Sequence, residues 1–216
     1  MSSRRRQWLG VLAAAAGLGV LSLAIPGIRT PILRALGRAL VADDAPAQAD
    51  MIVVATGADG AGVLEAADLV HSGVGTRVAV FADPPDPIVD REFIRRGVPY
   101  EDWAARSIQQ LNGLGVKMVE VIPRAVAGTD DEGRVLPGWC DERRLGSVVV
   151  VTTSDHSRRL RRVLRRSMGA RLTQVIVRSA RFSPFDPERW WQTPDTRRIG
   201  VIELQKLLLD VLLHPF

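Results

Sequence analysis

The sequence has few of the residues that form cross-links or bind metals. Its 216 residues include one cysteine, Cys140, and three histidines. A single cysteine excludes an internal disulfide, although it leaves a location outside the cytoplasm open. The acidic residues Asp130, Asp131 and Glu132 have no histidine or cysteine beside them. We therefore predict no metal site there, and interpret the cluster as the first turn of a helix, where carboxylates are favoured.

Lysine and aromatic residues are also scarce. Lys117 and Lys206 are the only lysines, so the formal net charge of +5 comes from arginine. Aromatic residues make up 5% of the chain. Nucleic-acid-binding sheets typically alternate aromatic and basic residues, and no predicted strand of this chain does so. We expect no nucleic-acid partner. Abundant arginine and alanine are instead typical of proteins from genomes rich in G and C.

In place of these residues, the chain has a long apolar run near its start. Residues 7–28 carry no charged side chain and follow Arg4, Arg5 and Arg6. A helix of this length can span a bilayer, and arginines ahead of it favour a cytoplasmic N-terminus. We expect residues 1–28 to form a single-pass transmembrane anchor, with the remaining chain outside the cytoplasm. The alternative is a cleaved export signal, because residues 4–9 resemble a twin-arginine motif.

Two further regions follow this run. Residues 29–48 are expected to form a juxtamembrane linker, with a short helix at about residues 32–41. Residues 49–216 alternate β-branched runs with amphipathic patterns, which predicts an α/β domain. We expect a Rossmann-like, three-layer domain with a mainly parallel sheet of about five strands, at residues 51–55, 77–82, 117–122, 148–151 and 171–177.

The last predicted helix, at about residues 195–214, combines many leucines with Glu203, Lys206 and Asp210. It is too charged to be a second membrane span. We predict that it is buried against the sheet, and shallow contact with a membrane is the alternative. The helix that follows the fourth strand is rich in arginine, and most of these side chains are expected to be solvated: Arg158, Arg161, Arg162, Arg165 and Arg166.

The stretch around the fourth predicted strand is the most informative about function. Residues 148–151 are four valines, typical of a strand buried on both faces, and a helical pattern follows after a short turn. Open parallel sheets bind ligands at the carboxyl ends of their strands. We predict that His156 acts there as a general acid or base and that Arg159 holds an anionic group. The turn supplies further candidate ligand-binding residues, Thr152, Thr153 and Ser154.

Two other turns are expected at the same edge of the sheet. The glycine-rich turn after the first strand contributes the candidate ligand-binding residues Gly57, Asp59 and Gly60, because amides at the start of a helix can bind an anion. The alternative is a simple tight connection between strand and helix. Thr129 with Glu132 has the form of a capping box. Thr129 is also a candidate for the ligand site, and Glu132 is expected to orient His156.

Several of these segments resemble one known family, the YdcF/SanA/ElyC-like bacterial proteins. The resemblance extends from about residue 49 to the C-terminus. It is carried by residues 49–54, 97–99, 128–132 and 151–159, and by Trp190, Trp191, Glu203 and Lys206. The resemblance implies a Rossmann-like α/β domain, often tethered to the bacterial inner membrane, that acts in the cell envelope. It identifies no cofactor and no oligomeric state.

Two kinds of function are consistent with the sequence. The first is a membrane-tethered envelope protein that binds a phosphorylated or nucleotide-like small molecule, with His156, Arg159 and Glu132 as catalytic residues, and acts in envelope biogenesis or barrier function. The second is a non-catalytic ligand-sensing or interaction module, for example one that binds S-adenosylmethionine. Residues 63–64 and 83–85 depart from the resembled family beside the ligand crevice, as a degraded active site would. Whether the protein is an enzyme is left open.

Overall fold

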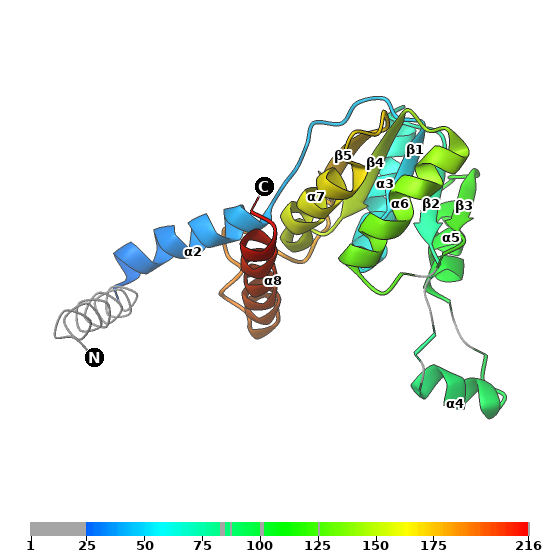
Figure 1. The fold of residues 1–216 in the computed structure, drawn as a ribbon. Coiled ribbons are helices and arrows are strands. Elements are labelled where there is room, and N and C mark those ends of the chain that lie inside the picture. Colours follow the sequence, from blue (N-terminus) through cyan, green and yellow to red (C-terminus); the bar gives the residue numbers. More distant parts are fainter. Residues whose placement is uncertain (1–24, 83–84, 87, 100–101, 125, 216) are drawn as a thin grey trace, which may run out of the picture.

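The computed structural model describes residues 25–82, 85–86, 88–99, 102–124 and 126–215. The described residues form seven helices and five strands (Figure 1). Almost all of the predicted anchor or export signal lies outside these ranges, so it stays a prediction. Among the described residues, none of the helices has the length and apolar character needed to cross a membrane.

Five parallel strands form one sheet in the order β3-β2-β1-β4-β5, which confirms the predicted α/β fold class. All residues of the two strands β1 and β2 are buried, as expected for strands covered on both faces. The valine run pairs with β1, with Met51 opposite Val148 and Val53 opposite Val150. The strands are β1 (Met51–Val54), β2 (Val78–Phe81), β3 (Val119–Ile122), β4 (Ser147–Thr152) and β5 (Gln174–Ser179).

The last strand begins three residues later than predicted. Its first ladder bond runs from the Gln174 amide to the Gly146 carbonyl oxygen at 2.9 Å. Thr173 is still in the preceding turn, where its hydroxyl donates to the Leu145 carbonyl oxygen at 2.7 Å. Leu172 is 98% exposed, although its apolar side chain favoured a place in the strand. The hydrophobic pattern of β5 alone does not show where its pairing with β4 begins.

Helices cover both faces of the sheet and complete the predicted three layers (Figure 1). Ile52 and Val54 point to the face covered by two helices, α3 (Asp59–His71) and α5 (Trp103–Gly113). Met51 and Val53 point to the opposite face, because successive side chains of a strand alternate. That face is covered by α6 (Thr129–Arg143) and α7 (Ser154–Met168).

A short helix, α4 (Val89–Arg95), projects from the body between β2 and α5 (Figure 1). None of its residues is buried. Ile88, Phe93 and Ile94 leave at least half of their surface exposed. This arm therefore adds nothing to the core of the domain.

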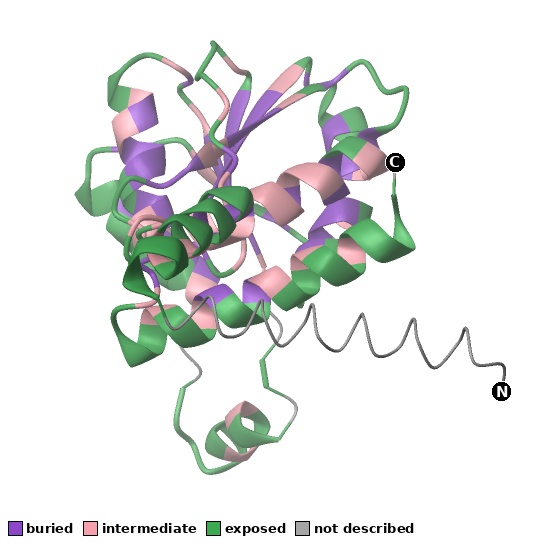
Figure 2. Ribbon diagram, turned by 90° about the vertical axis from the view of Figure 1, so that its left-hand side faces the viewer, coloured by how far each residue is buried: buried purple, intermediate pink, exposed green. Residues whose placement is uncertain are grey.

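Two helices, α2 (Pro26–Leu40) and α8 (Pro194–Leu213), form an outer layer on α7. The prediction that the last helix is buried against the sheet is wrong, because α6 and α7 already cover that face. Only Gly200 and Glu203 of α8 are buried, and much of its outer face is exposed (Figure 2). Trp190 packs between the two helices and donates its indole N–H to the Leu33 carbonyl oxygen at 2.8 Å.

Arginines of α7 bind this outer layer, so the expectation that they are solvated is wrong for several of them. Arg162 and Arg166 both bind the Asp210 carboxylate of α8, at 2.6 and 2.7 Å. Burial alone would raise the pKa of Asp210, but these two guanidinium groups lower it below its usual value. Arg158 donates to the Ala39 carbonyl oxygen of α2 at 3.2 Å.

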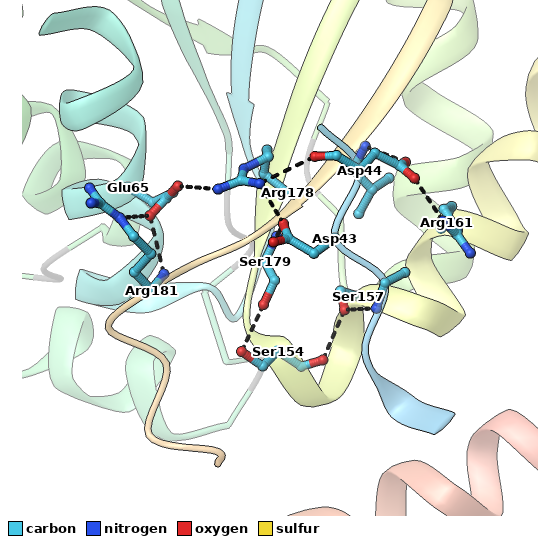
Figure 3. Close-up of polar contacts among 11 residues, drawn as sticks. Asp43, Asp44, Glu65, Ser154, Ser157, Arg161, Arg178, Ser179 and Arg181 are labelled. Atoms are coloured by element: carbon cyan, nitrogen blue, oxygen red, sulfur yellow. Dashed lines mark hydrogen bonds and ion pairs between the residues drawn. The ribbon is translucent and has the colours of Figure 1, made fainter. Parts of the chain in front are cut away.

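The segment between α2 and β1 follows the free edge of β5, so part of the predicted linker contacts the domain (Figure 3). The Asp44 amide donates to the Val177 carbonyl oxygen at 2.9 Å, and the Asp43 carboxylate accepts from the Ser179 amide at 3.1 Å. Arg161 of α7 binds the Asp44 carboxylate at 2.7 Å. These contacts occupy backbone groups that an edge strand would otherwise expose.

We predict that Gly200→Ala destabilises the protein by about 1–3 kcal/mol, because a Cβ at this position would overlap the Trp190 ring and force α8 outwards. Urea titration of the detergent-solubilised full chain measures the free energy of unfolding. Gly138→Ala is the matched control: it lies inside α6 and would meet only the Arg124 side chain, at 3.6 Å. Alanine loses less backbone freedom on folding than glycine does, so the control should be neutral or stabilising by up to ~1 kcal/mol. Equal losses in the two variants would contradict the prediction.

Candidate functional site

The candidate site lies where the order of the strands reverses. From β1 the chain crosses to β2 on one side, whereas β4 lies on the other side of β1. The loops after β1 and β4 therefore diverge and leave a crevice at the carboxyl ends of these strands, where open α/β sheets bind ligands. Thr56, Gly57 and Asp59 lie in or just after the first loop, and Thr153 and His156 follow the second.

His156 is at the centre of a polar network in the first turn of α7. Its Nε2 atom is 2.6 Å from the Thr129 hydroxyl, and its Nδ1 atom is 3.2 Å from Glu203 Oε2. Arg159 also approaches Nδ1, at 3.1 Å. Since arginine only donates, a neutral ring protonated at Nε2 accepts from Arg159 and donates to Thr129, whereas a neutral ring protonated at Nδ1 donates to Glu203 and accepts from Thr129. The protonated ring donates to both Thr129 and Glu203. His156 thus has hydrogen-bond partners in both protonation states.

Glu203 brings the outer helix α8 into the site. Its buried carboxylate accepts from Arg159 Nε at 3.1 Å and from Lys206 Nζ at 2.7 Å, in addition to its contact with His156. Burial would raise the pKa of Glu203, but the hydrogen bond and charge of His156, together with Lys206 and Arg159, lower it to about 2. The group is therefore an anion at neutral pH that holds His156 and Arg159 in place.

Glu132 is a second buried carboxyl group, with the opposite tendency. Its Oε1 atom accepts from the Thr56 amide at 2.6 Å and from the Thr56 hydroxyl at 2.5 Å. Its Oε2 atom is buried and has no hydrogen-bond partner among the described residues. Burial raises the pKa of Glu132 above its usual value, more than the bonds from Thr56 and the charge of His156 lower it. Protonation would let the unpartnered oxygen act as a donor.

The capping box predicted from Thr129 and Glu132 does not form. The N-cap of α6 is Gly128, without a side-chain cap. Thr129 instead contacts His156, and Glu132 contacts Thr56. No hydrogen bond between Glu132 and His156 occurs in the part of the chain that the structure describes, and Glu203 takes the orienting position expected of Glu132. Both side chains of the apparent capping box thus belong to the site.

Three helices begin at the crevice without a side-chain cap, namely α3, α6 and α7. Helices α5 and α8 are capped by Asp102 and Thr193. Amides in an uncapped first turn can donate to an anion, and the helix dipole favours negative charge there. One of these amides is already used, because Ser154 N donates to Ser183 Oγ at 3.1 Å. The crevice is thus lined by backbone donors from more than one element.

The structure gathers some of the predicted ligand residues and separates others. A cleft of about 520 Å³ is lined by Thr129, Arg159 and Lys206, among others. A neighbouring cleft of about 430 Å³ is lined by Gly57, Asp59, Thr153 and Glu203, and also by Lys206. The two clefts therefore meet at Lys206 of α8.

Three predicted ligand residues lie apart from these clefts. Gly60 lines a separate groove with Leu64 and Leu114. Ser154 points to β5, where its hydroxyl is 2.7 Å from that of Ser179 (Figure 3). Thr152 is fully buried, and its hydroxyl has no partner among the described residues. These residues support the shape of the turns around the site.

Glu203, Lys206 and Thr56 are site residues that the sequence reading left out of the site. The local signal for Glu203 was a carboxylate between apolar residues of the last helix, with a lysine three residues later. Its role depends on α8 crossing the first turn of α7, which no local pattern indicates. No group of three or more metal-ligating side chains is found in the ranges that the structure describes.

Comparison with known proteins adds little to this geometry. No family model matches the sequence, and no curated protein matches it. Among solved structures, the chain is similar to guanylylpyridinol- and ATP-bound HcgE from Methanothermobacter marburgensis. The match has 13% sequence identity and a TM-score of 0.29, and it covers 77% of this chain and 96% of that one. A similarity of this size supports no conclusion about function.

We predict that Glu203 makes the unfolding free energy of the chain depend on pH below about 4.5. Because its pKa is about 2 in the folded chain and near 4.5 when unfolded, its stabilising contribution is complete above pH 4.5 and is lost as the pH falls towards 2. Glu203→Gln should remove on the order of 3 kcal/mol from the fall in unfolding free energy over this range. Urea titrations at successive pH values measure how steeply the unfolding free energy changes with pH.

The matched control for this measurement is Glu142→Gln. Glu142 lies on the surface, where it pairs with Arg124 at 2.8 Å. An exposed ion pair contributes little to stability, so the slope of this variant should follow that of the unmodified protein. A Glu203→Gln slope identical to that of the control would refute the assignment of Glu203 as the buried anion of the site.

Proposed function

We propose that this chain is a membrane-tethered, YdcF/SanA-like protein of the bacterial cell envelope. In this proposal it binds a phosphorylated or nucleotide-like small molecule in the crevice between β1 and β4, and acts in envelope biogenesis or barrier function. The observation that carries the proposal is the placement of His156 between Thr129 and Glu203, with Arg159 in contact, at the switch point of the sheet. Such a placement is where α/β folds bind ligands.

Anion binding is supported by the donors that face the clefts. Arg159 uses Nε on Glu203 and one terminal nitrogen on His156, which leaves its other terminal nitrogen for a ligand. Lys206 lines both clefts. The remaining terminal nitrogen of Arg159 can donate to a phosphate oxygen, and the uncapped starts of α3 and α6 add backbone amides.

Proton transfer is supported by the order of groups along the network. A carboxylate, an imidazole and a hydroxyl follow one another as Glu203, His156 and Thr129. In this order the carboxylate orients the ring, and the far nitrogen of the ring can exchange a proton with the hydroxyl or with a ligand group that replaces it. His156 would therefore act from Nε2, on the side of the ring that faces Thr129.

A second candidate is a non-catalytic module that senses a ligand such as S-adenosylmethionine. One observation favours it: only 16% of the His156 side chain is exposed, and both ring nitrogens already have partners within the protein. A histidine held in this way can shape a binding site without exchanging protons with the ligand.

We predict that Arg159→Ala weakens binding of a phosphorylated ligand at least tenfold, which corresponds to about 1.4 kcal/mol for one lost charged hydrogen bond. Calorimetric titration of the detergent-solubilised full chain with ATP, S-adenosylmethionine and an isoprenyl phosphate measures the affinities. Arg166→Ala is the matched control, because it lies on the same helix and also binds α8, but through Asp210. It should lower stability and leave affinity unchanged. Equal affinity in all three proteins, or no binding of any ligand, would contradict the proposal.

The two candidate functions differ in the expected effect of His156→Ala. If His156 exchanges protons with the ligand, the variant should bind the ligand yet fail to restore the envelope phenotype of a host that lacks its own copy of the gene. Full restoration, with ligand binding retained, would favour the sensing module and exclude a catalytic role for this residue.

A further inference from the structure

The free end of α8 exposes an unusual number of aliphatic side chains. Its last six residues include five that are exposed and aliphatic, namely Leu208, Leu209, Val211, Leu212 and Leu213. The sixth, Asp210, turns inwards and binds Arg162 and Arg166. Single exposed leucines are ordinary on protein surfaces, but a contiguous set marks a contact with something else.

Helix α2 continues this surface. Ile25, Ile28, Ile32 and Leu36 are exposed at a spacing of three to four residues, which places them along one side of the helix. α2 packs on α8. We refer to these exposed aliphatic residues of α2 and α8 together as the α2–α8 surface.

The charges carried by helix α2 itself have one sign. Helix α2 contains Arg29, Arg34 and Arg38 and no acidic residue. The two carboxylates of α8 beyond its first turn, Glu203 and Asp210, are both turned towards α7 and paired with cations. Arg34 and Arg38 pair with Glu188, so Arg29 is the cation of α2 that remains for lipid headgroups. Apolar residues beside basic ones are typical of helices that lie on a membrane containing anionic lipids.

The sequence ahead of α2 indicates what covers the α2–α8 surface. The charge-free run of residues 7–28 leads directly into α2, so a chain inserted through this run has α2 at the lipid surface from its first residue. A second copy of the chain would cover the aliphatic residues but would give the charge-free run no part in the contact. A bilayer accounts for the apolar run, the exposed aliphatic residues and Arg29 together.

We propose that the α2–α8 surface rests on an anionic lipid bilayer, with the leucines of α8 among the lipid chains and Arg29 at the headgroups. The proposal builds on the proposed tether, which brings the surface to the membrane. It also orients the site, because Leu209 and Leu213 line the same cleft as Thr129 and Arg159. With α8 on the bilayer, the mouth of this cleft opens at the lipid surface.

The test places one environment-sensitive probe on the surface. Leu212→Cys replaces a side chain that is 68% exposed. The native thiol, Cys140, does not compete for the label, because it is buried and its pKa is raised to about 12 by burial. The labelled full chain is reconstituted in vesicles of phosphatidylethanolamine and phosphatidylglycerol. We expect blue-shifted emission from the probe and at least a twofold loss of intensity with brominated lipid chains.

Met118→Cys is the matched control for this experiment. Met118 is also exposed and directly precedes β3, at the edge of the sheet opposite to β5. Its probe should show water-exposed emission and no quenching by brominated lipids. Thermal unfolding of both labelled proteins checks that neither substitution disturbs the fold.

The possible outcomes distinguish failure of the membrane contact from failure of the tether. A chain that sediments with vesicles but whose Leu212→Cys probe behaves like the control would overturn the membrane contact and leave the tether intact. A chain that does not sediment with vesicles would overturn the tether, and an unquenched probe would then overturn the contact as well. Blue-shifted emission that brominated lipids do not quench, and that disappears on dilution, would show a second copy on this surface and also overturn the proposal.

Discussion

The arrangement of the site depends on one buried carboxylate, that of Glu203. Moving an ion from water into a protein interior costs several kcal/mol, and only close, well-placed partners offset this cost. Glu203 has three such partners, from His156, Arg159 and Lys206, and its pKa of about 2 shows that they more than offset burial. Because two of the partners belong to the first two turns of α7, the same contact fixes α8 on the domain and sets the orientation of the His156 ring. Loss of the carboxylate would leave Arg159 without its ion-pair partner in the site and free the ring to turn.

A second buried carboxyl group, that of Glu132 on α6, has a pKa shifted in the direction opposite to that of Glu203. Burial outweighs its hydrogen bonds from Thr56, so the pKa of Glu132 is raised, while the cations around Glu203 lower the pKa of that group. Pairs of ionisable groups whose surroundings push their pKa values apart are typical of sites that move protons. The difference arises from what each helix presents: α8 brings a carboxylate to cations, whereas α6 brings one to a backbone amide and a hydroxyl. Thr129, on the same turn of α6 as Glu132, contacts His156 and connects the two sides.

The sequence was sufficient for the sheet and for the place of His156, because both depend on local signals. The four valines of β4 are typical of a strand covered on two faces, and the turn that follows the end of a parallel strand has a fixed place in the fold. The partners of His156 were beyond prediction, since Glu203 lies 47 residues away and reaches it only through the crossing of α7 and α8. Local signals also misled: Thr129 and Glu132 have capping-box spacing but use their side chains elsewhere. Asp43 and Asp44 have the composition of a linker, yet they bind β5 through contacts that depend on an open sheet edge.

Helix α7 joins these parts into one unit. Its inner side, with Leu160, Leu164 and Met168, packs on the sheet. Its outer side binds the remaining layer residue by residue: Arg158 holds α2, Arg161 holds the segment before β1, and Arg162 and Arg166 hold α8. Partly buried ion pairs fix geometry more firmly than exposed ones, because water screens them less. A displacement of α8 along α7 would therefore shift Glu203 against His156 and strain the Asp210 pairs at the same time. The contact between α7 and α8 therefore holds the outer helix in place and also brings Glu203 to His156.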